Sequence, residues 1–171
     1  MTSNAWRAHR VHVGSIDVGF IDEADAFALR QIALAPAKPR KPPAYPTAVD
    51  QFHVGAFGDG EIVSAATFMI ENPDPEDTQM SLPLRCWRIR AMATLAPLRR
   101  RGYASAILAY GIHEIRKRQG VVVWCNGRVT AASFYEHHRF RRVRGIRHAP
   151  NVPDHFRFVR ELVDDNVAPA S

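Results

Sequence analysis

The 171-residue sequence has few cysteines, no long hydrophobic run and no metal-binding spacing of histidines. Its two cysteines, Cys86 and Cys125, form no CxxC pair, which excludes a disulfide framework and predicts buried thiols in a reducing cytoplasm. No run approaches the ~20 apolar residues of a membrane span, and the start, MTSNAWRAHR, lacks the apolar core of a signal peptide. His137 and His138 face different directions on a helix and no HxxxH or HExxH spacing occurs, so we expect no metal site.

The composition is typical of a globular protein, with 46% hydrophobic and 23% charged residues. A chain of this size buries about 70% of the surface that its unfolded form exposes, so it can fold without disulfides or metals. The length favours one domain, expected over residues 1–165, with a short disordered tail at 166–171.

The net charge of +6 makes nucleic-acid binding a hypothesis to weigh. The basic residues are spread over several segments, namely 38–41, 99–101, 116–118, 139–147 and 157–160. No aromatic platform of the kind found in RNA-binding sheets or single-strand-binding barrels is interleaved with them. We therefore expect no specific nucleic-acid site, and only weak binding that depends on low salt.

The stretch from Arg99 to Gly120 organises the chain. Its apolar or small residues repeat with the period of one helix face, at Ala104, Ile107, Leu108, Gly111, Ile112 and Ile115. Gly120 follows the last of them and suits a left-handed helix end. A strand-like run at 85–95 precedes this helix and an apolar run at 121–125 follows it, which predicts a βαβ unit.

The start of this helix has the composition of an anion site. Arg99, Arg100 and Arg101 lead into Gly102 and Ala104. The first N–H groups of a helix have no internal partner, and the helix dipole adds partial positive charge there. A turn with glycine and a small residue lets an anion approach the backbone, which is typical of a phosphate or pyrophosphate cradle. These residues leave open the alternative of an amphipathic helix with a basic, solvated start.

Strands and helices alternate over the rest of the chain. Strands are predicted over 6–16, 51–57, 61–70, 141–146 and 155–162, and helices over 22–34 and 131–138. Ala26, Leu29, Ile32 and Ala33 are expected on the buried side of the first helix, and Thr130 as the N-cap of the second. The turn at 58–60 predicts a hairpin, and the proline-rich segment 35–50 a stiff surface loop.

Two short blocks carry a resemblance. The segment from Arg99 to Ala104 fits the pattern R/Q-x-x-G-x-G/A. A second block at 126–140, NGRVTAASFYEHHRF, fits N…A-x-x-F/L-Y-x-x-x-G-F at Asn126, Ala131, Phe134, Tyr135 and Phe140. On these blocks the chain resembles the GNAT superfamily of acyl-CoA N-acyltransferases, and with the flanking strands the resemblance covers nearly the whole chain. Arg139 departs from the pattern, which has glycine there, so either the helix ends differently or this residue is strained.

The resemblance implies an α/β, single-domain GNAT-like fold, a mixed, splayed sheet of about six or seven strands with helices on both faces. The acyl donor that the resemblance implies is acetyl-CoA. Its pantetheine arm would pair with the strand before the helix, and its phosphates would bind at the helix start. The residues thus assigned to binding it are Met92, Ala93, Thr94, Arg99, Arg100, Arg101, Gly102, Tyr103, Ala104, Ser105 and Asn126. The N–H of Met92 or its neighbour would face the thioester carbonyl. Asn126, which precedes Gly127, also fits a simple turn.

Tyr135 matches the family tyrosine that protonates the leaving thiolate. A phenol, with a reference pKa of about 10, keeps its proton at neutral pH. The alternative is that Phe134 and Tyr135 form only a packing face. The strand 85–95 has no glutamate to serve as base, so Glu71, His155 or a water chain remain candidates, although each residue is more typical of a structural role.

The resemblance therefore implies a cytoplasmic N-acetyltransferase that passes an acetyl group directly from acetyl-CoA to a primary amine of a small molecule or peptide. No metal, membrane or specific nucleic acid is expected as a partner. Two alternatives from other classes remain, a non-catalytic acyl-CoA-binding protein of the GNAT fold and a basic nucleic-acid-binding module. The acceptor, the acyl-chain preference and the oligomeric state, a homodimer included, stay open.

Overall fold

The computed structural model describes residues 10–34, 50–74, 85–149 and 152–162. They form two compact units. The first unit holds the described residues up to Ile70 and those from Ile89 to Glu114, and the second unit holds the others. The described residues contain eight strands and three α-helices, one strand more than the upper end of the expected six or seven. The α/β class is as predicted.

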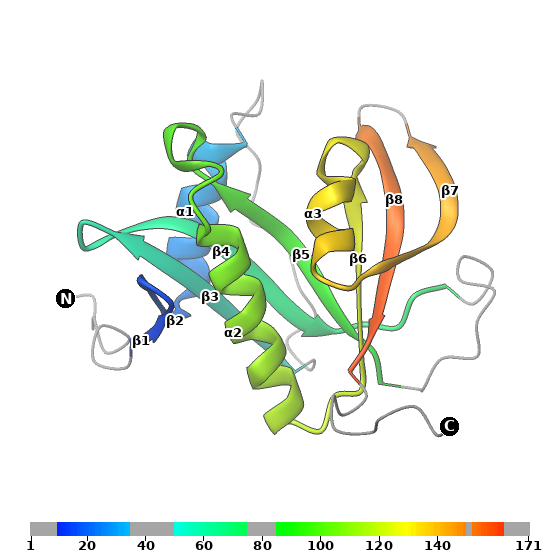
Figure 1. The fold of residues 1–171 in the computed structure, drawn as a ribbon, viewed down its shortest axis with the longest axis horizontal. Coiled ribbons are helices and arrows are strands. Elements are labelled where there is room, and N and C mark those ends of the chain that lie inside the picture. Colours follow the sequence, from blue (N-terminus) through cyan, green and yellow to red (C-terminus); the bar gives the residue numbers. More distant parts are fainter. Residues whose placement is uncertain (1–9, 35–49, 75–84, 150–151, 163–171) are drawn as a thin grey trace. The chain divides into compact units, whose positions relative to one another are not determined.

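Strands of the first unit follow one another in the order β1-β2-β3-β4-β5 (Figure 1). They are β1 (Val11–Val13), β2 (Ile16–Ile21), β3 (Gln51–Gly58), β4 (Glu61–Ile70) and β5 (Trp87–Thr94), the last belonging to this unit from Ile89 on. The predicted hairpin of β3 and β4 is confirmed. The single strand expected over 6–16 is wrong in its described part, because the chain turns after β1 and β2 pairs back on it. Ile16, Val18 and Phe20 of β2 alternate with Asp17 and Gly19, a strand period that the prediction cut off at Ile16.

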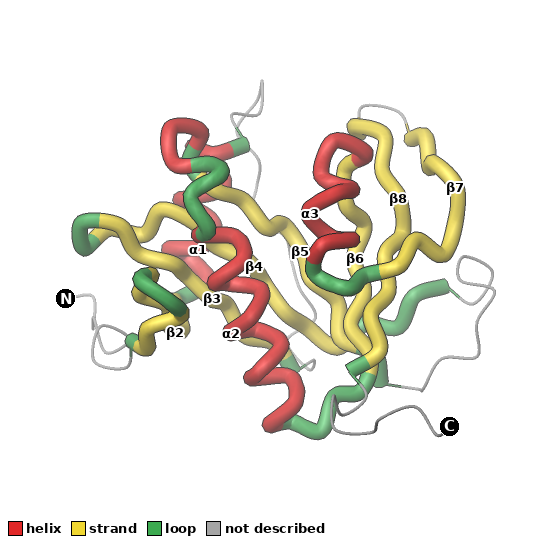
Figure 2. The backbone as a smooth tube through the Cα atoms, in the orientation of Figure 1, coloured by secondary structure: helices red, strands yellow, loops and turns green. Residues whose placement is uncertain are grey.

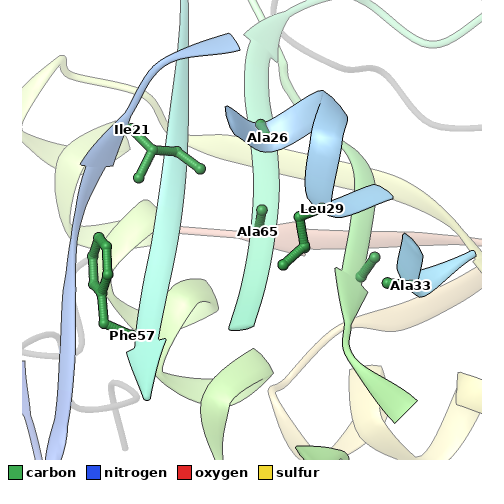
Figure 3. Packing of buried hydrophobic residues seen from close by; sticks show 7 residues of the cluster. Ile21, Ala26, Leu29, Ala33, Phe57 and Ala65 are labelled. Carbon is green, nitrogen blue, oxygen red and sulfur yellow. The ribbon is translucent and has the colours of Figure 1, made fainter. Parts of the chain in front are cut away.

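Two helices, α1 (Glu23–Ala33) and α2 (Tyr103–Lys117), cover opposite faces of the first unit's sheet (Figure 1). On the α1 face, Ala26, Leu29 and Ala33 pack with Ile21, Phe57 and Ala65 (Figure 3). On the α2 face, Tyr110 contacts Phe20 edge to face at 5.6 Å. Ile32, expected inside, is 70% exposed, whereas Arg30 is 7% exposed. Residues 26, 29, 30 and 33 share one face of a helix. The helical period therefore indicates that residue 30 is buried, whereas the hydrophobicity of Ile32 wrongly favoured burial of residue 32.

The end of α2 differs from the prediction in one residue. The left-handed residue is Gln119, with φ of 58°, and not Gly120. The N–H of Gly120 donates to the carbonyl of Ile115 at 2.9 Å, the bond that closes such a helix end. Glycine is needed at 120 for space, because an added Cβ would lie 2.6 Å from the Trp87 ring.

The second unit pairs its strands in the order β6-β8-β7, and both pairs are antiparallel (Figure 2). These are β6 (Val122–Arg128), β7 (Arg141–Ala149) and β8 (Val152–Glu161), with the helix α3 (Ala132–His137) packed on them. The strand predicted over 121–125 thus continues to Arg128, so Asn126 and Gly127 lie in a strand and the turn interpretation is wrong. Thr130 is not the N-cap, because a 3-10 turn η4 (Val129–Ala131) precedes α3 and Ala131 takes the cap position without a side-chain bond.

Arg139 takes the strained conformation that the sequence allowed. Its φ is 62°, and the N–H of Phe140 donates to the carbonyl of Tyr135 at 3.0 Å. This is the usual glycine-type helix end with an arginine in the left-handed position. The helix therefore ends with a left-handed residue, as the motif with glycine would, and the arginine at that position is strained.

Some predictions lie outside the described residues, namely the loop at 35–49 and the tail at 166–171. None of the helices within the described ranges is long and apolar enough to span a bilayer.

Candidate active site

The turn before α2 has the backbone of an anion cradle. A 3-10 turn, η3 (Ala96–Leu98), leads into Arg100, with φ of 65°, and Gly102, with φ of 87°. Only glycine takes such an angle as Gly102 has at little cost. Arg100, Arg101 and Gly102 are exposed, and the helix begins at Tyr103 beside half-buried Ala104 and Ser105. The predicted cradle residues therefore lie together at one exposed helix start.

Arg99 differs from its two neighbours. Its Nε donates to the carbonyl of Thr94 at 3.3 Å, and its Nη2 donates to the carbonyl of Ala33 at 3.2 Å. These bonds join the turn to β5 and to the end of α1. Arg99 is exposed like its neighbours, but these bonds give it a structural role in shaping the turn, so Arg100 and Arg101 are the cations available to the cradle.

The end of β5 is fixed to β4 by one buried hydroxyl. Ser64, fully buried, donates from Oγ to the carbonyl of Ala93 at 3.0 Å, and lies 2.7 Å from Oγ1 of Thr94. Because the Ser64 proton goes to Ala93, the Thr94 hydroxyl is the donor in the second bond. The strand segment expected to bind pantetheine is thus held in place, with Met92 and Thr94 half-buried and Ala93 buried.

Sequence reasoning missed a buried polar group beside β5. Arg30 donates from Nε to the carbonyl of Ala91 at 3.0 Å and from Nη2 to Oγ1 of Thr67 at 2.5 Å. Thr67 Oγ1 also lies 2.8 Å from Nδ1 of His53, and all three side chains are buried. Burial, and then the charge of Arg30, lowers the pKa of His53, while Glu23 and Asp22 act in the opposite direction. The predicted buried face of this helix did not include Arg30, and nothing in the sequence paired Arg30 with Thr67.

Tyr135 lies in the core of the second unit. Its side chain is 7% exposed and its ring stacks on Phe158 at 4.9 Å. Its hydroxyl donates a hydrogen bond to the thiol of Cys125. Burial, followed by Cys125, raises the pKa of Tyr135 well above its usual value, and burial raises the pKa of Cys125 to about 12. Tyr135 therefore keeps its proton at neutral pH, and both proposed roles, packing and proton donation, are compatible with this position.

Gly127 makes room for Tyr135. An added Cβ at this position would lie 2.4 Å from Cε2 of Tyr135 and 2.9 Å from the Phe158 ring. Real Cβ atoms do not come so close, so only glycine lets β6 and the ring of Tyr135 pack in this way. The Asn126–Gly127 pair, which resembled a turn, is thus a site of close approach.

Asn126 has a protein partner of its own. It lies opposite Arg157 in the pairing of β6 with β8, and its Oδ1 accepts a bond from Nε of Arg157 at 3.0 Å. Arg157 is 4% exposed and stacks over Trp124 at 4.6 Å. The amide oxygen of Asn126 therefore serves to satisfy a buried arginine, and its NH2 group keeps two donors for other partners.

The two residues considered as bases differ in their hydrogen bonds. Glu71 forms an ion pair with Arg88, which holds its carboxylate. Nδ1 of His155 lies 3.2 Å from the carbonyl of Pro153. A carbonyl only accepts, so Nδ1 carries the proton and Nε2 keeps a lone pair that can accept one. The geometry thus favours His155 over Glu71 as a proton acceptor.

Within the described residues, no group of three or more His, Cys, Asp or Glu side chains could hold a metal ion. Cys86 and Cys125 are both free and buried, as predicted. The described residues offer binding of an anion at the start of α2 and a protonated hydroxyl at Tyr135.

Comparison with known proteins agrees with this chemistry. In sequence, the chain is 27% identical over 122 residues to the uncharacterized N-acetyltransferase YitI of Bacillus subtilis, covering 70% of this chain and 78% of that protein. In structure, it is similar to Arabidopsis thaliana NAA60 in complex with acetyl-CoA, with a TM-score of 0.65, 18% identity and coverage of 86% and 98% of the two chains. It is also similar to the ribosomal-protein-S18-alanine N-acetyltransferase of Escherichia coli, with a TM-score of 0.62, 16% identity and coverage of 90% and 99%.

The structural matches show the fold, since their sequence identities are low. The family is shown by its own sequence model, which matches residues 21–140 and so includes both motif blocks completely. The chain accordingly belongs to the acetyltransferase (GNAT) family and is an enzyme of the N-acetyltransferase class.

Proposed function

We propose that this protein transfers an acetyl group from acetyl-CoA to a primary amine by direct attack. The observation that carries the proposal is the helix start of α2, where Gly102 has a φ of 87° and two exposed arginines precede it. Such a turn presents backbone N–H groups to a pyrophosphate. Arabidopsis thaliana NAA60, which shares the fold, is in complex with acetyl-CoA.

The backbone of β5 would hold the acyl end of the donor. Peptide groups at Met92, Ala93 and Thr94 bind the pantetheine amides, and the N–H of Met92 faces the thioester oxygen. Negative charge develops on this oxygen during attack, and a fixed N–H stabilises it. The bonds from Ser64 and Arg99 that hold this segment support the role, since such a donor works best when it does not need to reorient.

Proton transfers complete the reaction. The amine nitrogen bonds to the carbonyl carbon as the carbon–sulfur bond breaks, and the leaving thiolate takes the hydroxyl proton of Tyr135. In this proposal the hydroxyl turns from Cys125 to the sulfur, and solvent then returns the proton. The attacking amine must be neutral and gives up a proton, which Nε2 of His155 or a water chain accepts. The raised pKa of Tyr135 keeps its hydroxyl protonated at neutral pH, which a proton donor requires.

The acceptor is proposed only as a class. Proteins of this fold include one that acts on an alanine of a ribosomal protein and one named an aminoglycoside 6'-N-acetyltransferase. A small-molecule amine and a peptide amine are therefore both candidates here. A cytoplasmic location and a domain spanning 1–165 belong to the same proposal and stay predictions.

Calorimetry with acetyl-CoA tests the proposal. We expect the wild type to bind and Gly102→Glu to lose binding, because the substitution puts bulk and negative charge into the cradle. It also strains the backbone, so the matched control is Gly60→Glu, at a turn with φ of 85° and open space around an added Cβ. The control should bind like the wild type. No binding by a folded wild type would reject the transferase proposal.

A screen of amines then separates an enzyme from a non-catalytic binder. Acetylation of any amine at a rate above that of the protein-free control supports the transferase. Tight binding of acetyl-CoA with no turnover across peptide and small-molecule amines favours the sensor or scaffold. Salt-sensitive nucleic-acid binding that acetyl-CoA does not affect favours the basic binding module.

A further inference from the structure

Arg30 places a buried positive charge on a single peptide group of β5. Its guanidinium lies on the buried face of α1 and donates from Nε to the carbonyl of Ala91 at 3.0 Å. A hydrogen bond from a charged donor is stronger and more directional than one between neutral groups. Burial of a guanidinium is costly unless its donors are used. The Nε of Arg30 therefore binds the backbone oxygen of a residue 61 positions further along the chain.

Ala91 is a point of irregular backbone in β5. Its φ is 51°, a conformation that a residue with a Cβ adopts at a cost and that persists when its surroundings impose it. The burial of the strand shows the same irregularity. Trp87, Ile89 and Ala93 are buried in alternation, whereas Ala91 is exposed. The carbonyl that Arg30 binds thus belongs to the residue where the strand departs from its regular path.

The geometry of a peptide bond links this contact to Met92. The chain has no cis peptide bond among its described residues, so the Ala91–Met92 bond is trans and planar. In a trans peptide the C=O and the N–H point in opposite directions. Arg30 therefore holds the C=O end of the unit whose other end is the N–H of Met92. By fixing one end it fixes the direction of the other.

Thr67 and His53 fix Arg30 in turn. An arginine can only donate, so Oγ1 of Thr67 accepts from Nη2 and its own proton is free to go to Nδ1 of His53. That assignment makes His53 a neutral ring with its proton on Nε2. The three hydrogen bonds from His53 through Thr67 and Arg30 to Ala91 then each have a defined donor and acceptor. The set of these contacts is rigid, since all three side chains are buried.

We infer that Arg30 is a positioning residue for acyl transfer, which holds the Ala91 carbonyl so that the Met92 N–H is aimed at the thioester oxygen. The inference rests on the proposed function, since it assumes that acetyl-CoA binds along β5. Arg30 itself does not touch the reacting atoms. It determines how strongly the thioester carbonyl is polarised rather than how tightly the donor is held.

A pair of substitutions isolates the contact. Arg30→Met and Arg30→Gln both remove the guanidinium charge and the bond to Thr67. The glutamine amide nitrogen takes the position of the arginine Nε and can still donate to the Ala91 carbonyl, whereas the methionine methyl group at that position cannot. A general effect of charge or packing would alter both variants alike. The control is Arg10→Met, in the same unit, whose arginine lies over the Phe57 ring at 3.7 Å.

The readout is the carbonyl of acetyl-CoA labelled with carbon-13, observed by NMR and infrared spectroscopy while bound. We expect a downfield carbon shift and a lowered stretching frequency in the wild type and in Arg10→Met. Arg30→Met should lose most of this shift and still bind acetyl-CoA, and Arg30→Gln should recover it. A wild-type shift in Arg30→Met, or equal shifts in the Met and Gln variants, would overturn the inference.

A measurement on the wild type keeps the test valid where a variant does not fold. The amide signal of Met92 should move between the complexes with CoA and with acetyl-CoA, because only acetyl-CoA has a thioester carbonyl to accept its hydrogen bond. An unchanged Met92 signal overturns the inference and the part proposed for the Met92 N–H, whereas acetyl-CoA binding and acetylation of an amine would still support the transferase. Failure of the wild type to bind acetyl-CoA rejects both.

Discussion

The two units of this chain differ in what they do with their polar and charged residues. In its described residues the first unit has 6 Lys and Arg against 8 Asp and Glu, a net charge of −2. The second unit has 13 against 5, a net charge of +8. The first unit directs Arg30, Ser64 and Arg99 to backbone carbonyls. The second unit pairs Tyr135 with Cys125 and Arg157 with Asn126, and it also binds the carbonyl of Glu71 through Trp124.

This contrast suggests that the two units have different roles in the proposed reaction. Peptide groups bind a donor well only when the backbone is fixed, and the first unit has the bonds to fix it. A proton donor works through the environment of its side chain, and the second unit surrounds Tyr135 with aromatic rings and a thiol. The positive charge of the second unit would also attract a polyanionic donor over a distance of about 8–10 Å at ordinary salt.

The largest effect is expected from Tyr135→Phe. Loss of a general acid typically lowers kcat about 100-fold, whereas the binding of acetyl-CoA should change little because the ring and its packing remain. Steady-state kinetics with an amine found by screening, together with calorimetry, measure the two quantities. Equal kcat values for the variant and the wild type would leave Tyr135 only its packing role.

Gly127→Ala should destabilise the second unit by about 2 kcal/mol, because overpacking a filled core costs about 1–3 kcal/mol. The new methyl group would overlap the ring of Tyr135. Gly145→Ala is the matched control, since an added Cβ at this position meets no atom within 4 Å. Urea unfolding gives both free energies. Similar values for the two variants would show that the core around Tyr135 can shift to make room.

Arg139→Gly should stabilise the protein by about 1 kcal/mol, because a left-handed conformation costs a residue with a Cβ about 1–2 kcal/mol. Arg139 is exposed and its φ is 62°. The comparison variant Arg141→Gly lies in an extended strand, where glycine is unfavourable, so its effect should have the opposite sign. Thermal unfolding measures both. A destabilised Arg139→Gly would mean that the arginine side chain contributes more than its backbone conformation costs.

The smallest effect concerns pH and again distinguishes the units. Burial lowers the pKa of His53 in the folded first unit, so the folded state disfavours the protonated ring. Its stabilising contribution is therefore complete above the unfolded pKa of about 6.5 and is lost as the pH falls below it, by at most about 1.4 kcal/mol per pH unit. His53→Gln removes this one titrating group, so the free energy of unfolding should depend less on pH between pH 7 and pH 5. Urea unfolding measures it.

His138 provides the comparison in the second unit. Burial also lowers its pKa, followed by the effects of His137 and Arg160, but its side chain is only half-buried. His138→Gln should therefore flatten the pH dependence less than His53→Gln does. The reverse order would place the more strongly coupled histidine in the second unit.

Local sequence patterns were sufficient for much of the fold. The period of α2, the hairpin at Gly58–Gly60 and the apolar core of β6 each depend on contacts between residues close in sequence. The same is true of the cradle, since a glycine and adjacent arginines at a helix start are a local feature. Arg139 was also marked as strained from its place in the motif, and its φ confirms this.

Other features depend on which distant residues come together. The sequence placed Ile32 inside α1 and offered no reason to bury Arg30, whose partners lie 37 and 61 residues further along the chain. Gly120 and Gly127 looked like helix end and turn, but their roles are to admit the rings of Trp87 and Tyr135. Glycine has the same appearance in sequence whether it is needed for its φ or for its size.

The sequence by itself determined the family and the elements around the two motif blocks, and it supplied the hypothesis for the residues of the site. Only the tertiary structure decided that Arg99 binds backbone carbonyls, that Cys125 is the partner of Tyr135, and that Arg30 holds Ala91. Periodicity and turn chemistry act over a few residues, so they can be read locally. A buried hydrogen bond is chosen by whichever donor and acceptor the packed chain brings within about 3 Å, and that choice is made only on folding.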